Sequence, residues 1–262
     1  MRRRLDLHIE IHRAPIGKLK RNKEGDFVKS QIILALDTDD LDTARGWIEA
    51  TSASISIYKV GLEFFLKFGR TGLDALRSSG DFEIFLDLKL HDIPNTVAGA
   101  ARSVAQIAPK FLTVHASGGA EMISAAVSAA PAVSITAVTI LTSLNEADLH
   151  QIGFAHGPMD SAVTLAKLAV QAGARSIVCS PNEVAAIRAA VPASIELITP
   201  GVRPLGSDTA DQKRTTTPEA AIASGANYVV IGRPITSFWK VSPEAMSTAA
   251  MDIFTSINES AK

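Results

Sequence analysis

Phe85-Leu86-Asp87-Leu88-Lys89-Leu90-His91-Asp92-Ile93-Pro94-Asn95-Thr96 is the stretch of the sequence from which the fold can be predicted. Side chains alternate between the two faces of a strand, so Asp87 and Lys89 should point one way and the leucines the other. Proline disfavours the helical conformation in the residue before it, so the strand should end by Ile93. Asn95 or Thr96 can then cap a helix over residues 97–108. The stretch therefore predicts a strand whose C-terminal end presents carboxylates and an ammonium group, followed by a helix.

Short apolar runs alternate with segments of helical periodicity along the whole chain. They give eight predicted strands, at residues 31–37, 56–61, 82–90, 111–115, 135–141, 176–180, 195–199 and 228–231. Such runs are typical of parallel strands buried on both faces. A doubly wound open sheet would usually carry a glycine-rich fingerprint after its first strand, but Asp37-Thr38-Asp39-Asp40 stands there. Since 262 residues is close to the ~250 of one β/α barrel, we predict an α/β fold, a single-domain (β/α)8 TIM barrel over residues 29–262.

The composition excludes several classes of protein. The net charge of −1 gives no sign of a nucleic-acid partner or of binding to a membrane surface. No apolar run reaches the ~18 residues of a membrane-spanning helix. The single cysteine, Cys179, excludes an internal disulfide framework and a multi-cysteine metal site, and its apolar neighbours predict a buried side chain. We therefore expect a soluble, cytoplasmic enzyme that acts on a small molecule.

The first residues of the chain differ from the rest. Residues 1–30 hold nine Lys or Arg against four Asp or Glu, so the remainder of the chain is acidic. This segment has no apolar region of the kind that a secretory signal needs. We interpret residues 1–28 as a disordered basic extension or as the product of a misassigned start, with Val28 as the natural one.

The C-terminal ends of the strands meet at one mouth of a β/α barrel, and the active sites of such enzymes lie there. The predicted strand ends carry Asp37, Lys59, Asp87, Lys89, His115, Thr142, Gly201, Gly232 and Arg233. A lone Asp-x-Lys pair would most simply be a salt bridge at a strand end. The predicted mouth instead alternates in sign, through Asp37, Lys59, Asp87, Lys89 and Asp92. This alternation predicts lysines that stay charged because carboxylates flank them. Charged lysines suit proton donation and not Schiff-base formation, which needs a neutral amine.

The segments after the last two strands predict a phosphate site. In these barrels the corresponding loops bind phosphate through backbone N–H groups and a helix N-terminus. Gly232-Arg233-Pro234 follows the eighth strand and could also be a mere turn with a surface arginine. The loop over residues 201–214 favours the phosphate site. Its length is typical of an active-site lid, and its polar side chains that could bind phosphate are Arg203, Gln212, Lys213 and Arg214.

No metal site is predicted, because His, Asp and Glu do not recur at ligand spacings. His91 and His115 stand at strand ends, where a histidine is more often structural. Both are therefore left out of the predicted catalytic set.

The chain resembles the orotidine 5′-monophosphate decarboxylases, of bacterial and monofunctional type, from about residue 31 to residue 257. The segments that carry the resemblance are Leu-Ala-Leu-Asp37, Tyr-Lys59-Val-Gly, the string from Asp87 to Thr96, Val-His-Ala-Ser-Gly-Gly119, Leu-Thr142-Ser, Thr-Pro-Gly-Val-Arg203-Pro, Asp-Gln212-Lys-Arg214 and Ile-Gly232-Arg233-Pro. The resemblance implies a lyase of pyrimidine biosynthesis that converts orotidine 5′-monophosphate to UMP. It also implies a homodimer with shared active sites and no cofactor.

The resemblance further implies roles for individual residues. Lys89 would stabilise and protonate the carbanion at carbon 6, with Asp87 facing the substrate carboxylate and Lys59 in the same charged catalytic network. Asp92, also catalytic, and Thr96 would reach into the site of the partner subunit. The other implied substrate contacts are Asp37 and Lys59 at the ribose, Thr142 at the pyrimidine, and Arg203, Gln212, Gly232 and Arg233 at the phosphate.

Two alternatives remain open. Sugar-phosphate decarboxylases and synthases of the same barrel superfamily resemble the Asp-x-Lys-x-x-Asp core, but they need magnesium and carry an acid at the second strand, where this chain has Lys59. A barrel that only binds a phosphorylated ligand would have lost part of the charged network, and this chain retains all of it.

Overall fold

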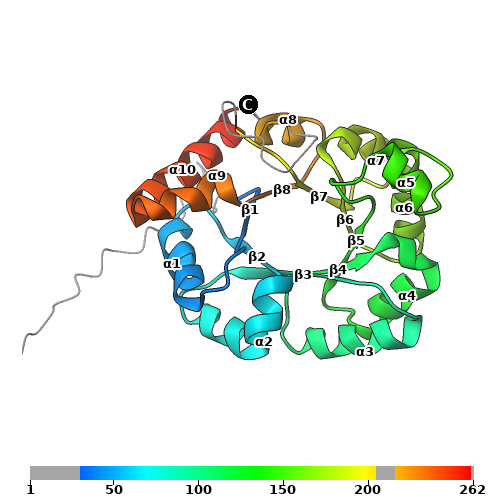
Figure 1. Ribbon diagram of the computed structural model, residues 1–262, viewed down its shortest axis with the longest axis horizontal. Helices are drawn as coiled ribbons and strands as arrows, with labels where there is room; N and C mark the ends of the chain where they lie inside the picture. The colour runs from blue at the N-terminus through cyan, green and yellow to red at the C-terminus, as the bar shows by residue number, and fades with distance from the viewer. Residues whose placement is uncertain (1–29, 205–215, 261–262) are drawn as a thin grey trace, which may run out of the picture.

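The computed structural model describes residues 30–204 and 216–260, and within them eight parallel strands close into a barrel (Figure 1). Each strand pairs with the next along the chain, and β8 pairs with β1. The strands are β1 Ile32–Ala35, β2 Ile57–Gly61, β3 Glu83–Leu90, β4 Phe111–His115, β5 Ser134–Val138, β6 Ser176–Val178, β7 Glu196–Pro200 and β8 Tyr228–Ile231. The predicted (β/α)8 barrel is confirmed. The predicted extension at residues 1–28 lies outside the described residues.

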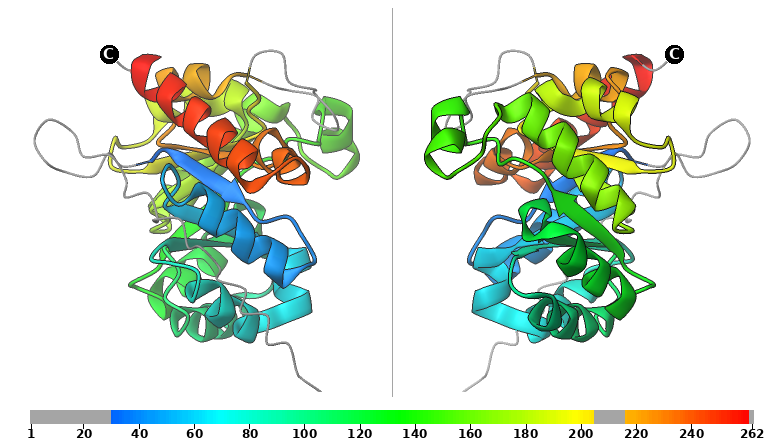
Figure 2. Two further views of the ribbon diagram at one scale, coloured as in Figure 1. Left: turned by 90° about the vertical axis from the view of Figure 1, so that its left-hand side faces the viewer. Right: turned by 90° about the vertical axis from the view of Figure 1, so that its right-hand side faces the viewer.

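Helices surround the barrel and cover its outer face (Figures 1 and 2). They are α1 Leu41–Thr51, α2 Leu62–Arg77, α3 Pro94–Ala105, α4 Gly119–Ala129, α5 Glu146–Gln151, α6 Pro158–Gln171, α7 Val184–Ala190, α8 Pro218–Ala223, α9 Arg233–Thr236 and α10 Pro243–Ser260. α10 packs against α1, so the first and last helices complete the outer layer (Figure 2). In the described part of the chain, no helix has the length and apolar character needed to cross a membrane.

In residues 30–204 and 216–260, apolar side chains form two separate cores. The larger lies between the strands and the helices, and the smaller fills the inside of the barrel. In the smaller core the ring of Phe111 meets those of Phe85 and Tyr228 edge to face, at centroid distances of 5.6 and 5.7 Å. Because these rings fill the barrel interior, space for a ligand lies above them, at the C-terminal ends of the strands.

The helix after β3 begins earlier than predicted. α3 starts at Pro94, and Ile93 occupies the N-cap position in an extended conformation, so the predicted caps Asn95 and Thr96 are wrong. Proline is favourable in the first turn of a helix because the N–H that it lacks would have no helical acceptor. The same proline therefore ends the strand and begins the helix.

β3 departs from a regular strand near its C-terminal end. Lys89 has a φ of +48°, in the left-handed region, and the pairing register between β3 and β4 shifts between Leu86 and Leu90. Asp87 and Lys89 still lie together as predicted, since Lys89 Nζ is 2.9 Å from both carboxylate oxygens of Asp87. Such irregularities are common beside active sites, where they re-aim a side chain.

Candidate active site

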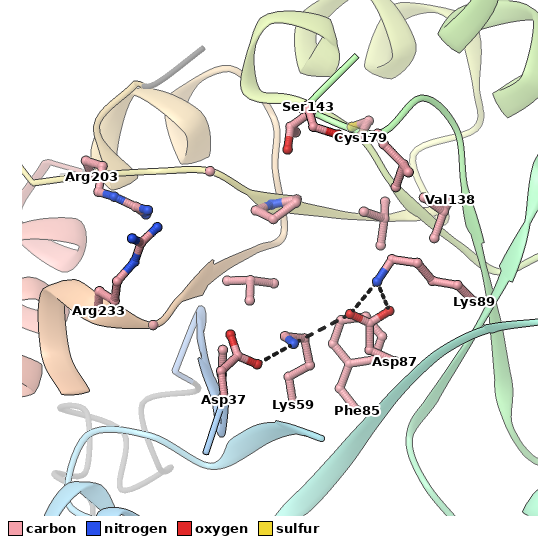
Figure 3. Close-up of a pocket in the computed structure, with 18 of the residues that line it drawn as sticks. Asp37, Lys59, Phe85, Asp87, Lys89, Val138, Ser143, Cys179, Arg203 and Arg233 are labelled. Atoms are coloured by element: carbon pink, nitrogen blue, oxygen red, sulfur yellow. Dashed lines mark hydrogen bonds and ion pairs between the residues drawn. The ribbon is translucent and has the colours of Figure 1, made fainter. Parts of the chain in front are cut away.

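A cavity of about 380 Å³ opens at the C-terminal ends of the strands (Figure 3). Seven strands contribute to its wall, either directly or through the loop that follows them, and β4 does not. The predicted site residues in this wall are Asp37, Lys59, Asp87, Lys89, Thr142, Arg203, Gly232 and Arg233. Asp92 and Thr96 are exposed and do not line the cavity, and Gln212 lies outside the described residues.

Two lysines and two aspartates form a continuous charged array along one side of the cavity (Figure 3). Lys59 Nζ lies 3.1 Å from Asp37 Oδ1 and 3.6 Å from Asp87 Oδ2. Lys89 Nζ lies 2.9 Å from Asp87 Oδ1. The charges therefore alternate from Asp37 through Lys59 and Asp87 to Lys89, as the sequence predicts, whereas Asp92, the fifth predicted member, does not line the cavity.

The array keeps its charges despite burial. Burial by itself lowers the pKa of Lys59, but the attraction of Asp37 and Asp87 outweighs it, and the pKa lies above its ordinary value. Burial likewise raises the pKa of Asp87, but the attraction of Lys59 and Lys89 outweighs it, and the pKa lies below its ordinary value. Lys59 and Asp87 are thus both ionised at neutral pH.

Thr113 of β4 also contacts the array, although it is not among the predicted site residues. Its hydroxyl donates to Asp87 Oδ1 at 3.0 Å, and the backbone N–H of Lys89 donates to Thr113 Oγ1 at 2.7 Å. The sequence carries no signal for this role, because threonine in an apolar strand is ordinary in any sheet.

Two arginines lie across the cavity from Lys89. Arg203 and Arg233 direct their guanidinium groups toward one another (Figure 3). Arg203 is nearly buried, and its Nη1 donates to the carbonyl of Val202 at 2.8 Å. Arg233 begins α9, and Gly232 precedes it. Two convergent guanidinium groups are suited to a phosphate group, which they can bind with several hydrogen bonds at once.

The rest of the wall is largely apolar. Its apolar members include Ala35, Phe85, Val138, Ile140, Val178, Cys179 and Val230, and Thr142 and Ser143 add hydroxyl groups. Cys179 is buried as predicted, and burial raises the pKa of its thiol to about 12, so it is not a thiolate nucleophile. Among the residues that the structure describes, no three His, Cys, Asp or Glu side chains are grouped so that they could hold a metal ion.

Asp92 lies on the rim outside the cavity. Its Oδ1 accepts a hydrogen bond from the backbone N–H of Ile93 at 2.6 Å, and the Ile93 side chain is 66% exposed. The rings of His91 and His115 lie close to one another beside this rim, with centroids 5.4 Å apart and planes tilted by 42°. Burial lowers the pKa of His115, and the nearby His91 and Lys89 lower it further. Neither histidine lines the cavity.

Several known proteins are similar to this chain. The family described as "Orotidine 5'-phosphate decarboxylase / HUMPS family" matches residues 30–241. A relative from Thermobifida fusca (strain YX), named orotidine 5′-phosphate decarboxylase, is 56% identical over 205 residues, which cover 78% of this chain and 88% of the relative. A relative of the same name from Frankia casuarinae is 48% identical over 225 residues, covering 79% of this chain and 82% of the relative.

A solved structure gives the same result for the fold. The crystal structure of orotidine 5′-phosphate decarboxylase from Lactobacillus acidophilus matches with a TM-score of 0.73 at 32% sequence identity. The match covers 86% of this chain and 99% of that one. The similarity thus extends over the whole barrel.

Proposed function

The chain belongs to the orotidine 5′-phosphate decarboxylase / HUMPS family, and we propose that the charged array in its cavity performs the decarboxylation. The enzyme is a carboxy-lyase that converts orotidine 5′-monophosphate to UMP, a step of pyrimidine nucleotide synthesis. The observation that carries the assignment of the site is the alternation of Asp37, Lys59, Asp87 and Lys89, each within 3.6 Å of the next.

The chemistry requires charge stabilisation at carbon 6 of the pyrimidine. When CO2 leaves, the electron pair stays in an orbital in the plane of the ring, where the π-system cannot delocalise it. A fixed positive charge at this position lowers the energy of the transition state. The ammonium group of Lys89 supplies this charge, and the electron pair at carbon 6 then takes a proton from Lys89 Nζ. The amine that remains regains its proton from water.

The other residues of the cavity orient the nucleotide. Arg203, Arg233 and Gly232 bind the phosphate, and Gln212 belongs to the same phosphate site in this proposal. Asp37 and Lys59 bind ribose hydroxyl groups, and Thr142 binds the edge of the base. The position of the two arginines at one end of the cavity, with Lys89 across from them, supports this proposal for the phosphate and for the reacting carbon. Binding energy at the phosphate can then hold the reacting carbon beside Lys89.

Turnover is expected to be independent of metal ions. The charged array places lysine ammonium groups where a metal-dependent enzyme would need metal ligands. We therefore expect orotidine 5′-monophosphate to be consumed at the same rate with and without EDTA. The change in absorbance on decarboxylation measures this rate. Activity lost in EDTA and restored by magnesium would favour the magnesium-dependent sugar-phosphate enzymes instead. A chain that binds UMP but turns nothing over would be a non-catalytic barrel.

Arg233→Ala should raise the KM for the nucleotide by about 10- to 100-fold, because a charge-assisted contact with the phosphate is lost. Binding of the phosphate-free nucleoside, measured by calorimetry, should change little. Arg45→Ala is the matched control, because Arg45 lies on α1, outside the cavity, and pairs with Asp42. Equal losses for nucleotide and nucleoside would mean that the phosphate lies elsewhere.

We also propose that the enzyme is a homodimer in which the partner subunit's Asp92 and Thr96 complete each site. Asp92 and Thr96 are exposed on the rim, next to the exposed side chain of Ile93, an apolar group that a partner could cover. A second hollow of about 180 Å³ reaches Lys59 and Lys89 from the side of α2. A carboxylate that enters there from a partner would extend the alternation of charges.

A cytoplasmic location without nucleic-acid or membrane partners belongs to the same proposal. The net charge of −1 and the single cysteine support it. The substrate is a small nucleotide, and its size agrees with a cavity of about 380 Å³.

A further inference from the structure

We propose that Thr113 is a positioning residue that holds Lys89 and Asp87 in their reactive geometry from behind the cavity wall. Thr113 lies on β4, the strand that contributes nothing to that wall, and it is fully buried. The inference rests on the proposed function of Lys89 and Asp87. It adds a residue whose own side chain does not reach the substrate.

The backbone of Lys89 needs support, because its φ of +48° is one that residues with a side chain rarely adopt. A regular β3–β4 ladder would supply backbone hydrogen bonds here, but the register between these strands shifts between Leu86 and Leu90. The N–H of Lys89 instead donates to Thr113 Oγ1 at 2.7 Å. The hydroxyl of Thr113 thus takes the place of a backbone acceptor at the irregular position.

The same hydroxyl also orients the carboxylate. An ionised aspartate can only accept and a backbone N–H can only donate, so the Thr113 hydroxyl must accept from Lys89 and give its one proton to Asp87. That proton points to Asp87 Oδ1 at 3.0 Å, while Asp87 Oδ2 lies 3.6 Å from Lys59 Nζ. Through these two hydrogen bonds, the Thr113 hydroxyl fixes both the rotation of the Asp87 carboxylate and the backbone conformation of Lys89.

Water cannot easily replace this hydroxyl. Thr113 has no exposed surface, and the side chain of Asp87 is only 12% exposed. Without the hydroxyl, the N–H of Lys89 would lose its acceptor and Asp87 would lose one donor. The backbone of Lys89 could then relax toward the extended conformation, which would move the ammonium group away from carbon 6 of the substrate.

A buried threonine on the neighbouring strand provides a control that distinguishes the positioning role of Thr113 from an effect on packing. Thr136 of β5 stands directly opposite Thr113 in the sheet and is equally buried. Its hydroxyl bonds to Ser176 Oγ at 2.7 Å and does not reach the charged array. Thr136→Val therefore removes a buried hydroxyl from the neighbouring strand without touching the site.

The test compares Thr113→Val, Thr113→Ser and Thr136→Val in steady-state assays with orotidine 5′-monophosphate. Thr113→Val keeps the shape of the side chain, and we expect it to lower kcat by about 10- to 100-fold, as for loss of a hydrogen bond to a charged group. The KM and the Kd of UMP should stay within about threefold, because the arginines across the cavity are unchanged. Thr113→Ser keeps the hydroxyl and should restore kcat to within about threefold of wild type. Thr136→Val should leave kcat unchanged.

The results distinguish a positioning role of Thr113 from a packing effect, and both from a failure of the proposed function. An active wild type with equal kcat values for Thr113→Val and Thr136→Val would overturn the positioning role alone. A fall in kcat that Thr113→Ser does not restore would assign the loss to packing and also overturn it. A wild type that does not decarboxylate the substrate would overturn the proposed function, and this inference with it. If Thr113→Val does not fold, Thr113→Ala and Thr136→Ala make the same comparison with smaller side chains.

Discussion

Lys89→Ala is expected to lower kcat by roughly 10⁴-fold or more while the enzyme still binds UMP. One ammonium group provides both the charge that stabilises the carbanion and the proton that quenches it. Each of these functions alone is typically worth about 10²- to 10³-fold or more in rate. UMP already carries a hydrogen at carbon 6 and has no carboxylate there, so its affinity should depend mainly on contacts at the phosphate and ribose.

The measurements are kcat from single-turnover experiments and the Kd of UMP from calorimetry. Lys167→Ala is the matched control, because Lys167 is an exposed lysine on the outer helix α6. A variant that keeps its kcat and only raises KM would show that Lys89 is a binding residue and not the proton donor.

Mixing two inactive variants, Lys89→Ala and Asp92→Ala, is expected to restore activity. If the partner subunit's Asp92 completes each site, a heterodimer has one site with both lesions and one site with neither. When subunits exchange freely in an equal mixture, about half of the dimers are mixed and half of their sites are intact, so recovery should approach about a quarter of wild type. Each parent alone should stay near zero, so the expected gain is large.

The sharpest form of this experiment uses two different affinity tags. Co-expression and sequential purification yield the heterodimer alone, which should show about half the activity of the wild-type dimer, since one of its two sites is intact. As a control, Lys89→Ala mixed with Asp87→Ala should not recover, because both residues belong to the same chain's cavity. Activity of the Lys89/Asp92 mixture no greater than the sum of the parents would mean that each site is built from one chain.

The barrel could be predicted from the sequence because each strand is a short apolar run and is followed by a helical pattern. The charged array could be predicted for a related reason. In a β/α barrel every strand ends at the same mouth, so Lys59 and Asp87 had to approach one another once both were placed at strand ends. A residue's place at the end of a strand in the sequence was therefore enough to predict its place at the mouth of the barrel.

The features that the sequence did not reveal depend on contacts between strands. Alternation predicted a regular strand through Lys89, but its left-handed backbone follows from the shifted register with β4, which no local pattern encodes. Thr113 escaped prediction because its role depends on that same shift. The start of α3 was misplaced because Asn95 and Thr96 were favoured as caps, whereas Pro94 occupies the first helical turn.

The array pairs its alternating charges with one another, and two of its members, Lys59 and Asp87, are largely buried. Taking Lys59 and Asp87 out of water opposes folding, and apolar side chains of similar size at such sites often give a protein that is as stable or more stable. Substitutions that stabilise the fold would therefore tend to replace these charges, and under the proposed function it is selection for turnover that retains them. The free energy of arranging them is supplied once, when the chain folds, so no dipoles need to be reorganised in each catalytic cycle.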